Sequence, residues 1–192
     1  MADVPRARAV VLAAGAGTRY AASGGEGHKL LADFRGRPVV AWAIDHALQA
    51  GLDPVCVVVG ATAIPVPAGV EVIENPRWSE GIATSLTAAV DAAEAADDDA
   101  VVIGLGDQPL VSPEAWRRVA AADGGAAIAV GTYDGVRGHP VRLAASVWPL
   151  LPRTGDEAAR TLMRAHPDLV LEVPCPGRSV DVDTVEDVTR WS

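Results

Sequence analysis

Several classes of protein are excluded by what the sequence has little of. Aromatic residues make up only 4% of the 192 residues, and cysteine occurs only at Cys56 and Cys175. The two cysteines have neither metal-site spacing nor a disulfide framework, so we expect both to be reduced and structural. Positive charge is also scarce: 16 Lys and Arg against 25 Asp and Glu give a formal net charge of −9. This balance repels phosphate backbones and argues against nucleic acid as a partner.

Long apolar runs are absent too. No run approaches the roughly 20 residues that span a bilayer, so we expect no membrane partner. The N-terminal stretch MADVPRARAV lacks the apolar core and cleavage site of a secretory signal, and a cytoplasmic location is the default expectation. What is present is a globular composition, with 49% hydrophobic residues dominated by Ala and Val. It predicts a core of small side chains between helices and a sheet.

Strand-like and helix-like patterns alternate along the chain. Apolar runs predict strands at 9–14, 55–59, 70–73, 100–105 and 126–130, helical spacing predicts helices at 38–50, 81–95 and 112–122, and 179–187 reads as a strand leading into a short helix. The triplet Asp97, Asp98 and Asp99 is expected to be a solvated loop. No repeat or linker divides residues 1–192. The pattern therefore predicts one α/β domain with a doubly wound, mostly parallel, Rossmann-like sheet.

The most informative stretch is VVLAAGAGTR at residues 10–19, an apolar run that stops at two glycines. Without side chains, Gly15 and Gly17 let backbone amides approach an anion closely. Arg19 and Lys29 can add positive charge around that anion. We therefore interpret this stretch as a cradle for a nucleotide triphosphate.

Two better-known glycine motifs do not fit. The dinucleotide fingerprint fails because Tyr20 stands at its third glycine position. The ATP-type P-loop fails at residues 24–29, because Lys29 follows a histidine and precedes Leu30 instead of Ser or Thr.

The stretch LAAGAGTR…K does resemble the LAAGxGxR…K signature of MobA-like nucleotidyltransferases, most closely the molybdenum cofactor cytidylyltransferase branch, and the resemblance covers nearly the whole chain. It implies transfer of CMP from CTP to the terminal phosphate of a molybdopterin-type acceptor, with Mg²⁺ as cofactor and pyrophosphate as the other product. A recipient molybdoenzyme is the further partner that it suggests. Guanylyl members usually have a second glycine where Ala14 stands, which favours CTP over GTP.

The same resemblance assigns residues. It implies that the nucleotide is bound by Leu12, Ala13, Ala14, Gly15, Ala16, Gly17, Thr18, Arg19 and Lys29, and that Arg19, Lys29 and Asp107 are catalytic. NPRWSEGIATSL at 75–86 is similar to the branch's NPxWxxGxxxSL, which would place Asn75, Gly81 and Ser85 against base or ribose. From the residues alone, the start of a turn explains Asn75 equally well, and close packing explains Gly81 equally well.

Candidate metal ligands follow two apolar segments. Asp107 in LGDQPLV ends a predicted strand, where α/β sheets gather their ligands, and Mg²⁺ usually takes one or two protein carboxylates. SVDVDTVED at 179–187 resembles the family's DIDTPEDL, which makes Asp183 the second ligand and Asp181 the alternative. The role of Gln108 is left open.

The acceptor side is indicated by two further segments. RGHPV at 137–141 resembles the branch and places His139 near the acceptor, although a structural role is also open. TGDEAAR at 154–160 looks like GDxGAR, so Asp156 and Arg160 would flank the acceptor, but Asp156 equally fits a helix N-cap. The chain departs from the family at the glycine-rich insertion 20–28, which equally fits a mobile lid, a segment that displaces Lys29, or a sign of a different acceptor.

Other functions remain open at this point. They are guanylyl transfer, another phosphorylated acceptor, a nicotine blue oxidoreductase-like reductase that uses NAD(P)H, and a non-catalytic nucleotide-binding accessory protein. The sequence contains no recognisable flavin or nicotinamide motif to support the reductase. The presence of both Asp107 and Asp183 speaks against a non-catalytic role.

Overall fold

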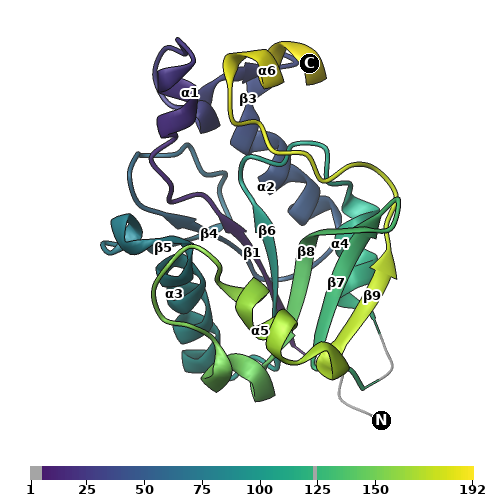
Figure 1. Ribbon diagram of the computed structural model, residues 1–192. Coiled ribbons are helices and arrows are strands. Elements are labelled where there is room, and N and C mark those ends of the chain that lie inside the picture. Colours follow the sequence, from purple (N-terminus) through teal and green to yellow (C-terminus); the bar gives the residue numbers. More distant parts are fainter. Residues whose placement is uncertain (1–5, 123–124) are drawn as a thin grey trace.

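The computed structural model describes residues 6–122 and 125–192, and its centre is a seven-stranded sheet (Figure 1). In spatial order the strands are β5 (Glu71–Glu74), β4 (Val55–Val59), β1 (Ala7–Leu12), β6 (Ala100–Leu105), β8 (Val136–Ala144), β7 (Ile128–Tyr133) and β9 (Val170–Pro174). β1 pairs in parallel with β4 and β6, β4 with β5, and β7 with β9, whereas β8 is antiparallel to both of its neighbours. The prediction of a mostly parallel α/β sheet is confirmed.

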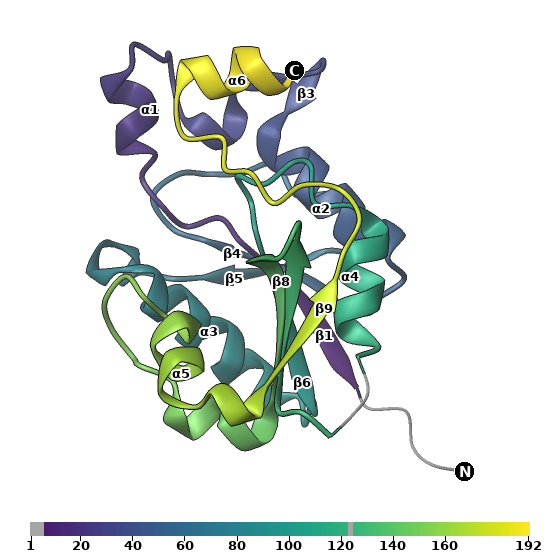
Figure 2. The same cartoon turned by 45° about the vertical axis from the view of Figure 1, so that its right-hand side comes forward.

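Helices cover both faces of this sheet (Figures 1 and 2). The α-helices of the described residues are α1 (Thr18–Ala22), α2 (Val39–Gln49), α3 (Ile82–Ala95), α4 (Pro113–Ala120), α5 (Ala159–Ala165) and α6 (Val185–Trp191), and the 3-10 turns are η1 (Lys29–Leu31), η2 (Trp78–Glu80), η3 (Ala145–Leu150) and η4 (Pro167–Leu169). A small hairpin of β2 (Asp33–Phe34) and β3 (Arg37–Pro38) completes the elements. None of the helices in the described residues is long and apolar enough to cross a membrane.

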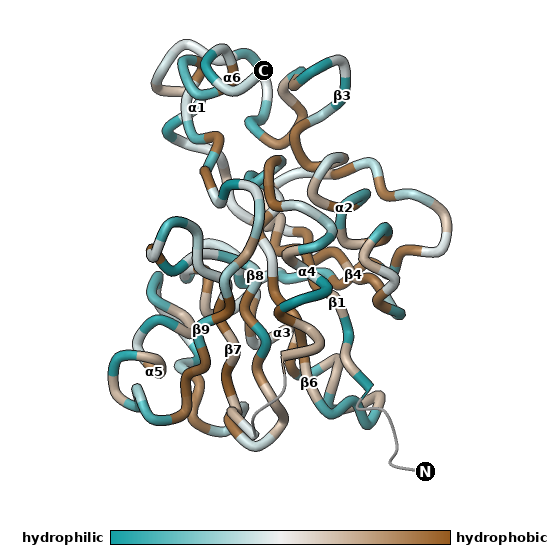
Figure 3. The backbone as a smooth tube through the Cα atoms, turned by 90° about the vertical axis from the view of Figure 1, so that its right-hand side faces the viewer, coloured by the Kyte–Doolittle hydropathy of each residue, from teal (hydrophilic) through white to brown (hydrophobic). Residues whose placement is uncertain are grey.

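The core has two halves because successive side chains of a buried strand point to opposite faces. On one face, Val10 and Leu12 of β1 belong to a cluster with Leu86 of α3. On the other face, Ala9 and Val11 belong to a cluster with residues of α2 and α4. Figure 3 shows the resulting apolar strands at the centre of the molecule.

A third, smaller core lies beyond the strand ends. Tyr20 of α1 is buried with Phe34, Val39 and Val182, so that α1, the β2–β3 hairpin and α6 gather at one end of the sheet (Figures 1 and 2). The glycine-rich insertion is therefore packed against the rest of the chain through Tyr20. A side chain at Gly25 would lie 2.2 Å from the Tyr20 ring, which shows how tightly the insertion turns.

The structure corrects several sequence predictions. The first strand ends at Leu12, which leaves 13–17 as a loop, and α1, which runs from the glycine turn into the insertion, was not predicted. Residues 179–184 form no strand, although the short helix after them is present as α6. The strand predicted at 126–130 is observed at Ile128–Tyr133. The expectation about the N-terminal stretch falls partly on residues 1–5, outside the described residues.

The aspartate triplet is the clearest correction. Asp97 and Asp99 are exposed, but the Asp98 side chain is only 1% exposed and accepts a hydrogen bond of 2.8 Å from Nε of Arg8. The Arg8 side chain is itself buried and also reaches Glu71 at 2.7 Å. The expected solvated loop is therefore wrong for Asp98, which neutralises a buried arginine of β1.

Candidate active site

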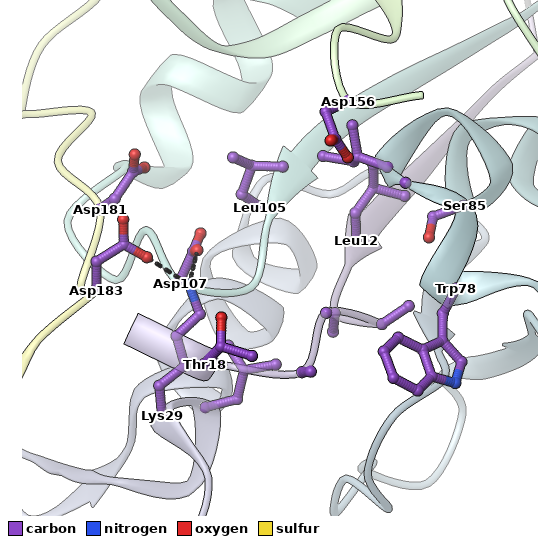
Figure 4. A pocket seen from close by; sticks show the side chains of 18 of the residues that line it. Leu12, Thr18, Lys29, Trp78, Ser85, Leu105, Asp107, Asp156, Asp181 and Asp183 are labelled. Carbon is purple, nitrogen blue, oxygen red and sulfur yellow. Dashed lines mark hydrogen bonds and ion pairs between the residues drawn. The ribbon is translucent and has the colours of Figure 1, made fainter. Parts of the chain in front are cut away.

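A cavity of about 590 Å³ opens beyond the ends of β1 and β6 (Figure 4). Every residue that we expected to contact the nucleotide lines it except Asn75. Asp107, Asp181 and Asp183 lie in its wall, and Figure 4 shows the Asp107 and Asp183 side chains pointing toward Lys29, whereas the Asp181 carboxylate points away from it. The structure thus brings the glycine turn, Lys29 and the C-terminal segment to one place.

The floor of this cavity is the turn between β1 and α1. Gly17 has φ +66°, a left-handed conformation that glycine adopts readily, and a Cβ there would lie 3.2 Å from Cγ of Lys29. A Cβ at Gly15 would meet nothing within 4 Å, so a larger side chain would extend into open space. The two glycines keep this turn free of side chains, which suits close contact with phosphate oxygens.

Lys29 is the only lysine of the sequence and lies at the centre of the site. Its Nζ donates to Oδ2 of Asp107 at 2.6 Å and to Oδ1 of Asp183 at 2.7 Å. Burial opposes its charge, but the two carboxylates outweigh burial and raise the pKa of Lys29. The insertion has therefore not displaced Lys29 from the site.

The inserted segment is attached to the glycine turn by His28. Its Nδ1 accepts a hydrogen bond from the Leu30 amide at 3.3 Å, and its Nε2 lies 2.8 Å from the Gly15 carbonyl. Because Nδ1 accepts, the ring proton belongs on Nε2, which can donate to Gly15. Through this imidazole the end of the inserted segment is attached to the glycine turn, next to Lys29.

The Asp107 side chain is mostly buried, with 18% of its surface exposed, and one of its carboxylate oxygens lacks a hydrogen-bond partner within the described residues. Burial raises the pKa of its carboxyl, and the charge of Lys29 offsets this only in part. Oδ2 accepts from Lys29, whereas Oδ1 is buried and has no hydrogen-bond partner within the described residues. An unpartnered carboxylate oxygen is a ligand that a divalent cation prefers, so Asp107 fits a metal ligand.

The two C-terminal aspartates have different partners. Asp183 contacts Lys29 and Arg19; burial raises its pKa, but the two cations outweigh burial and leave it lowered. Asp181 instead accepts from Nε2 of Gln108 at 2.7 Å. No group of three or more His, Cys, Asp or Glu in the described part of the chain is arranged to hold a metal. Asp183 is the aspartate that shares Lys29 with Asp107.

Asn75 is turned away from the cavity. It is 4% exposed, and its Nδ2 donates to Thr84 and Ser85 at 2.9 Å each, while its Oδ1 accepts from the Arg77 amide. These contacts fit the turn role and correct the expectation that Asn75 contacts base or ribose. Asn75 instead orients Ser85, which does line the cavity.

Gly81 lines the cavity but is also required for packing. Its φ is +104°, and a Cβ would lie 2.4 Å from the carbonyl oxygen of Gly155. Gly155 in turn accepts from the Ala83 amide at 3.0 Å. The loop that carries Asp156 is thereby held against the start of α3.

Trp78 is a cavity residue to which we assigned no role from the sequence. It lines the wall opposite the aspartates (Figure 4). A Cβ at Gly60 would lie 2.7 Å from Cβ of Trp78 and 2.9 Å from Cβ of Ala14, so Gly60 lies close to both residues. The sequence feature that could have identified Trp78 as a cavity residue was its position between Asn75 and Gly81 in a single motif.

A second cavity of about 650 Å³ adjoins the first. Both cavities are lined by Leu12, Arg19, Ile82, Leu105, Asp156, Arg160 and Asp181. His139 lines only the second cavity. Burial, together with the charge of Arg160, lowers the pKa of His139 to about 4.

Asp156 does not cap α5, whose N-cap is Ala158, so the N-cap alternative is wrong. All three expected acceptor-side residues therefore lie in the second cavity.

The fold and this paired site define an α/β enzyme of the nucleotidyltransferase class. The MobA-like NTP transferase domain model matches residues 9–170, and the chain belongs to this family.

Three relatives illustrate the match. The chain is 33% identical to nicotine blue oxidoreductase of Paenarthrobacter nicotinovorans, over 98% of this chain and 97% of the relative. It is 27% identical to a nucleotidyl transferase from Methanothermobacter thermautotroptrophicus, with a TM-score of 0.80 over 96% and 95% of the two chains. It is 29% identical to Rv0371C of Mycobacterium tuberculosis H37Rv in complex with manganese, with a TM-score of 0.73 over 97% of each chain.

Proposed function

We propose that this protein transfers CMP from CTP to the terminal phosphate of a molybdopterin-type acceptor and releases pyrophosphate. The observation that carries the proposal is the position of Lys29 beside the glycine turn, with its ammonium group between Asp107 and Asp183. A cation and two carboxylates at an amide-lined turn suit a triphosphate and its counter-ion. The adjoining second cavity offers space for the acceptor.

In this mechanism an oxygen of the acceptor phosphate attacks the α-phosphorus of CTP, the bond to the β-phosphate breaks, and pyrophosphate leaves. The attacking phosphate is already an anion, so positioning and charge neutralisation carry the reaction. The turn at Gly15, Ala16 and Gly17 holds the triphosphate. Arg19 and Lys29 offset the charge that develops on pyrophosphate.

Arg160 is the natural partner of the acceptor phosphate. It lines both cavities, and no hydrogen bond or ion pair satisfies its exposed guanidinium group within the described residues. His139 is neutral at pH 7, because its pKa is about 4, and can still donate one hydrogen bond to the acceptor. Asp107 and Asp183 would hold Mg²⁺, which when bound neutralises charge on the phosphates.

The base preference rests on Ala14 and Trp78, which both line the cavity and both lie close to Gly60. The methyl group of Ala14 narrows the cavity on the side of the indole, which favours a pyrimidine over the larger guanine. Ser85, oriented by Asn75, supplies a hydroxyl for hydrogen bonding to base or ribose.

A second candidate function is favoured by the similarity to nicotine blue oxidoreductase along nearly the full length of both chains. An oxidoreductase would place a reducible ring in the second cavity. It predicts consumption of NADH or NADPH in the presence of a quinone-like dye, without any release of pyrophosphate.

The test is a pyrophosphate-release assay with CTP, GTP or ATP, Mg²⁺, and molybdopterin that carries molybdenum. We expect release that depends on the acceptor and is fastest with CTP. Release with GTP at an equal rate would overturn the base assignment. No release with any nucleotide, together with oxidation of NADPH by a dye, would favour the oxidoreductase.

A further inference from the structure

The ammonium group of Lys29 lies where the two proposed metal ligands meet. Its Nζ is 2.6 Å from Oδ2 of Asp107 and 2.7 Å from Oδ1 of Asp183, and all three side chains are mostly buried. Figure 4 shows both carboxylates pointing toward this group. A Mg²⁺ ion that bound the same two oxygens at about 2.1 Å would lie beside the ammonium group, and the two positive charges would repel each other.

We infer that Lys29 and a divalent cation compete for Asp107 and Asp183. Without nucleotide, the ammonium group keeps the two carboxylates and excludes the cation. A triphosphate in the glycine turn draws the ammonium group away and so admits the cation. The inference rests on the triphosphate site of the proposed function and adds to it that metal ion and triphosphate bind only together.

Asp183 is engaged by cations of the chain on both of its oxygens. Oδ1 accepts from Lys29, and Oδ2 accepts from Nη1 of Arg19. Asp181 offers no substitute, because its Oδ1 accepts from Gln108 at 2.7 Å and its carboxylate points away from Lys29 (Figure 4). Asp183 therefore becomes available to a metal ion only when one of its two cations leaves.

Lys29 can exchange partners by rotation of its side chain. Its backbone is held in η1, where its carbonyl accepts from the Ala32 amide at 3.2 Å, and the preceding His28 is joined to Gly15. Its Cγ lies 3.2 Å from the position of a Cβ at Gly17, so the stem already runs along the glycine turn. Rotation about the outer bonds of this flexible stem turns the ammonium group from the carboxylates toward a phosphate in that turn.

A triphosphate changes the competition in two ways. It offers Lys29 several anionic oxygens in exchange for the carboxylates, and it supplies the metal ion with further oxygen ligands. Mg²⁺ usually takes one or two protein carboxylates and completes its shell with waters and substrate phosphates. Within the described residues no group of three or more His, Cys, Asp or Glu could hold a metal ion. Because coupling between two ligands is reciprocal, each should bind more tightly when the other is present.

The experiment measures Mn²⁺ binding in the absence of nucleotide by electron paramagnetic resonance, which detects the free ion. Lys29→Met removes the positive charge and keeps an unbranched side chain. We expect its affinity for Mn²⁺ to be about tenfold or more above that of wild type, because a repelling charge next to the metal ligands is lost.

Three further variants locate the effect. Lys29→Arg keeps a cation and should bind Mn²⁺ as weakly as wild type. Asp107→Asn combined with Lys29→Met should abolish the gain, since it removes one of the two carboxylates. Arg37→Met removes an equal charge from an exposed ion pair with Asp45, away from the cavity, and should change Mn²⁺ affinity by less than about twofold because surface charges are screened.

Thermal unfolding gives a second readout. Lys29→Met leaves Asp107 without its positive partner and should melt at a lower temperature than wild type in metal-free buffer. Mn²⁺ should restore part of this loss, because an ion that binds only the folded chain stabilises it, and should hardly affect wild type. Lys29→Gln replaces Lys29→Met if the latter does not fold. An equal effect of Mn²⁺ on wild type and variant would contradict the competition.

The role of the triphosphate is tested with CTP. In wild type, CTP should tighten Mn²⁺ binding by about tenfold or more beyond the Mn²⁺ that CTP binds in buffer, which is measured separately. The inference is overturned if CTP gives no such tightening, if Lys29→Met binds no Mn²⁺, or if it binds Mn²⁺ no more tightly than wild type. A gain in Lys29→Met and tightening by CTP, without pyrophosphate release in the presence of acceptor, would retain the inference and reject the transferase reaction instead.

Discussion

Lys29 is the residue on which the proposed chemistry depends most. Its ammonium lies between Asp107 and Asp183, and its pKa is raised by both, so it is charged at neutral pH. Lys29→Ala and Asp107→Ala should each lower kcat by more than about tenfold, because each removes about 1.4 kcal/mol or more of transition-state stabilisation. Single-turnover assays at saturating CTP measure this loss.

The matched controls for these variants are Arg37→Ala and Asp45→Asn, which alter an exposed ion pair away from the cavity. They should retain wild-type turnover. As a separate measure, an amine-reactive label can modify no lysine except Lys29, and CTP should protect that position. Turnover near the wild-type level in Lys29→Ala would remove Lys29 from the mechanism.

His139 should make stability depend on pH. Its pKa is lowered to about 4 by burial and by Arg160, whereas an unfolded histidine titrates at about 6.5. Between these two pKa values the unfolded chain binds a proton that the native chain does not bind. The contribution of neutral His139 to the free energy of unfolding is therefore fully present above pH ~6.5 and is lost as the pH falls toward 4. Urea unfolding between pH 7 and 4 should show a shallower loss in His139→Gln than in wild type. Parallel curves for the two proteins would contradict this explanation.

At the scale of elements, a buried ion pair attaches the loop after α3 to β1. The Arg8 and Asp98 side chains are 6% and 1% exposed. Asp98→Ala removes the buried carboxylate from Arg8, which keeps only the exposed Glu71 as an acidic partner, and should cost about 3–5 kcal/mol of unfolding free energy. Asp97→Asn, at the exposed neighbour, should be nearly neutral. Equal denaturant midpoints for the two variants would show that the pair is dispensable.

The insertion is the second element with a testable role. His28 joins it to the glycine turn through Gly15 and Leu30. His28→Ala removes two hydrogen bonds of about 0.5–1.5 kcal/mol each, so affinity for CTP should fall by up to about a hundredfold, with kcat much less affected. Stopped-flow binding and steady-state turnover separate the two effects. A lower kcat with unchanged affinity would instead indicate a lid that acts after binding.

Periodicity predicted the central elements well and the peripheral ones poorly. The apolar runs of β4 and β6 and the helical spacing of α2 and α3 are set by burial between layers, a signal carried in the local sequence. The short α1 has one buried residue, Tyr20, whose partners Phe34 and Val182 lie far along the chain. No local pattern encodes such a contact.

The same limit applies to the site. Motif resemblance indicated Lys29, Asp107 and Asp183, and the structure brings their charged atoms within hydrogen-bonding distance. The roles of Asn75 and Asp98 could not be predicted, because each depends on which buried partner lies opposite, Ser85 in one case and Arg8 in the other. The proposed competition with the metal ion likewise depends on the contact between Lys29 and Asp183, which are 154 residues apart in sequence.

At the scale of the whole molecule, the sheet brings two cavities of about 590 and 650 Å³ together at one edge. Both volumes fall within the roughly 300–1,000 Å³ that is usual for small-molecule sites. A nucleotide that binds only the folded chain stabilises it by about 2.7 kcal/mol at one hundred times its Kd. With Mg²⁺ present, CTP should therefore raise the melting temperature more than GTP at the same concentration. An equal shift with both nucleotides would argue against selection by the Ala14 and Trp78 wall.

The most direct test of the transferase reaction follows the atom that is transferred. CTP labelled at the α-phosphorus is incubated with the protein, Mg²⁺ and molybdopterin carrying molybdenum, and the label is traced by chromatography and mass spectrometry. We predict that the label appears in a pyrophosphate-bridged adduct of CMP and the acceptor, and that Lys29→Ala forms it more than about tenfold more slowly. Label that remains in CTP, or that appears only as free CMP, would contradict nucleotidyl transfer to this acceptor.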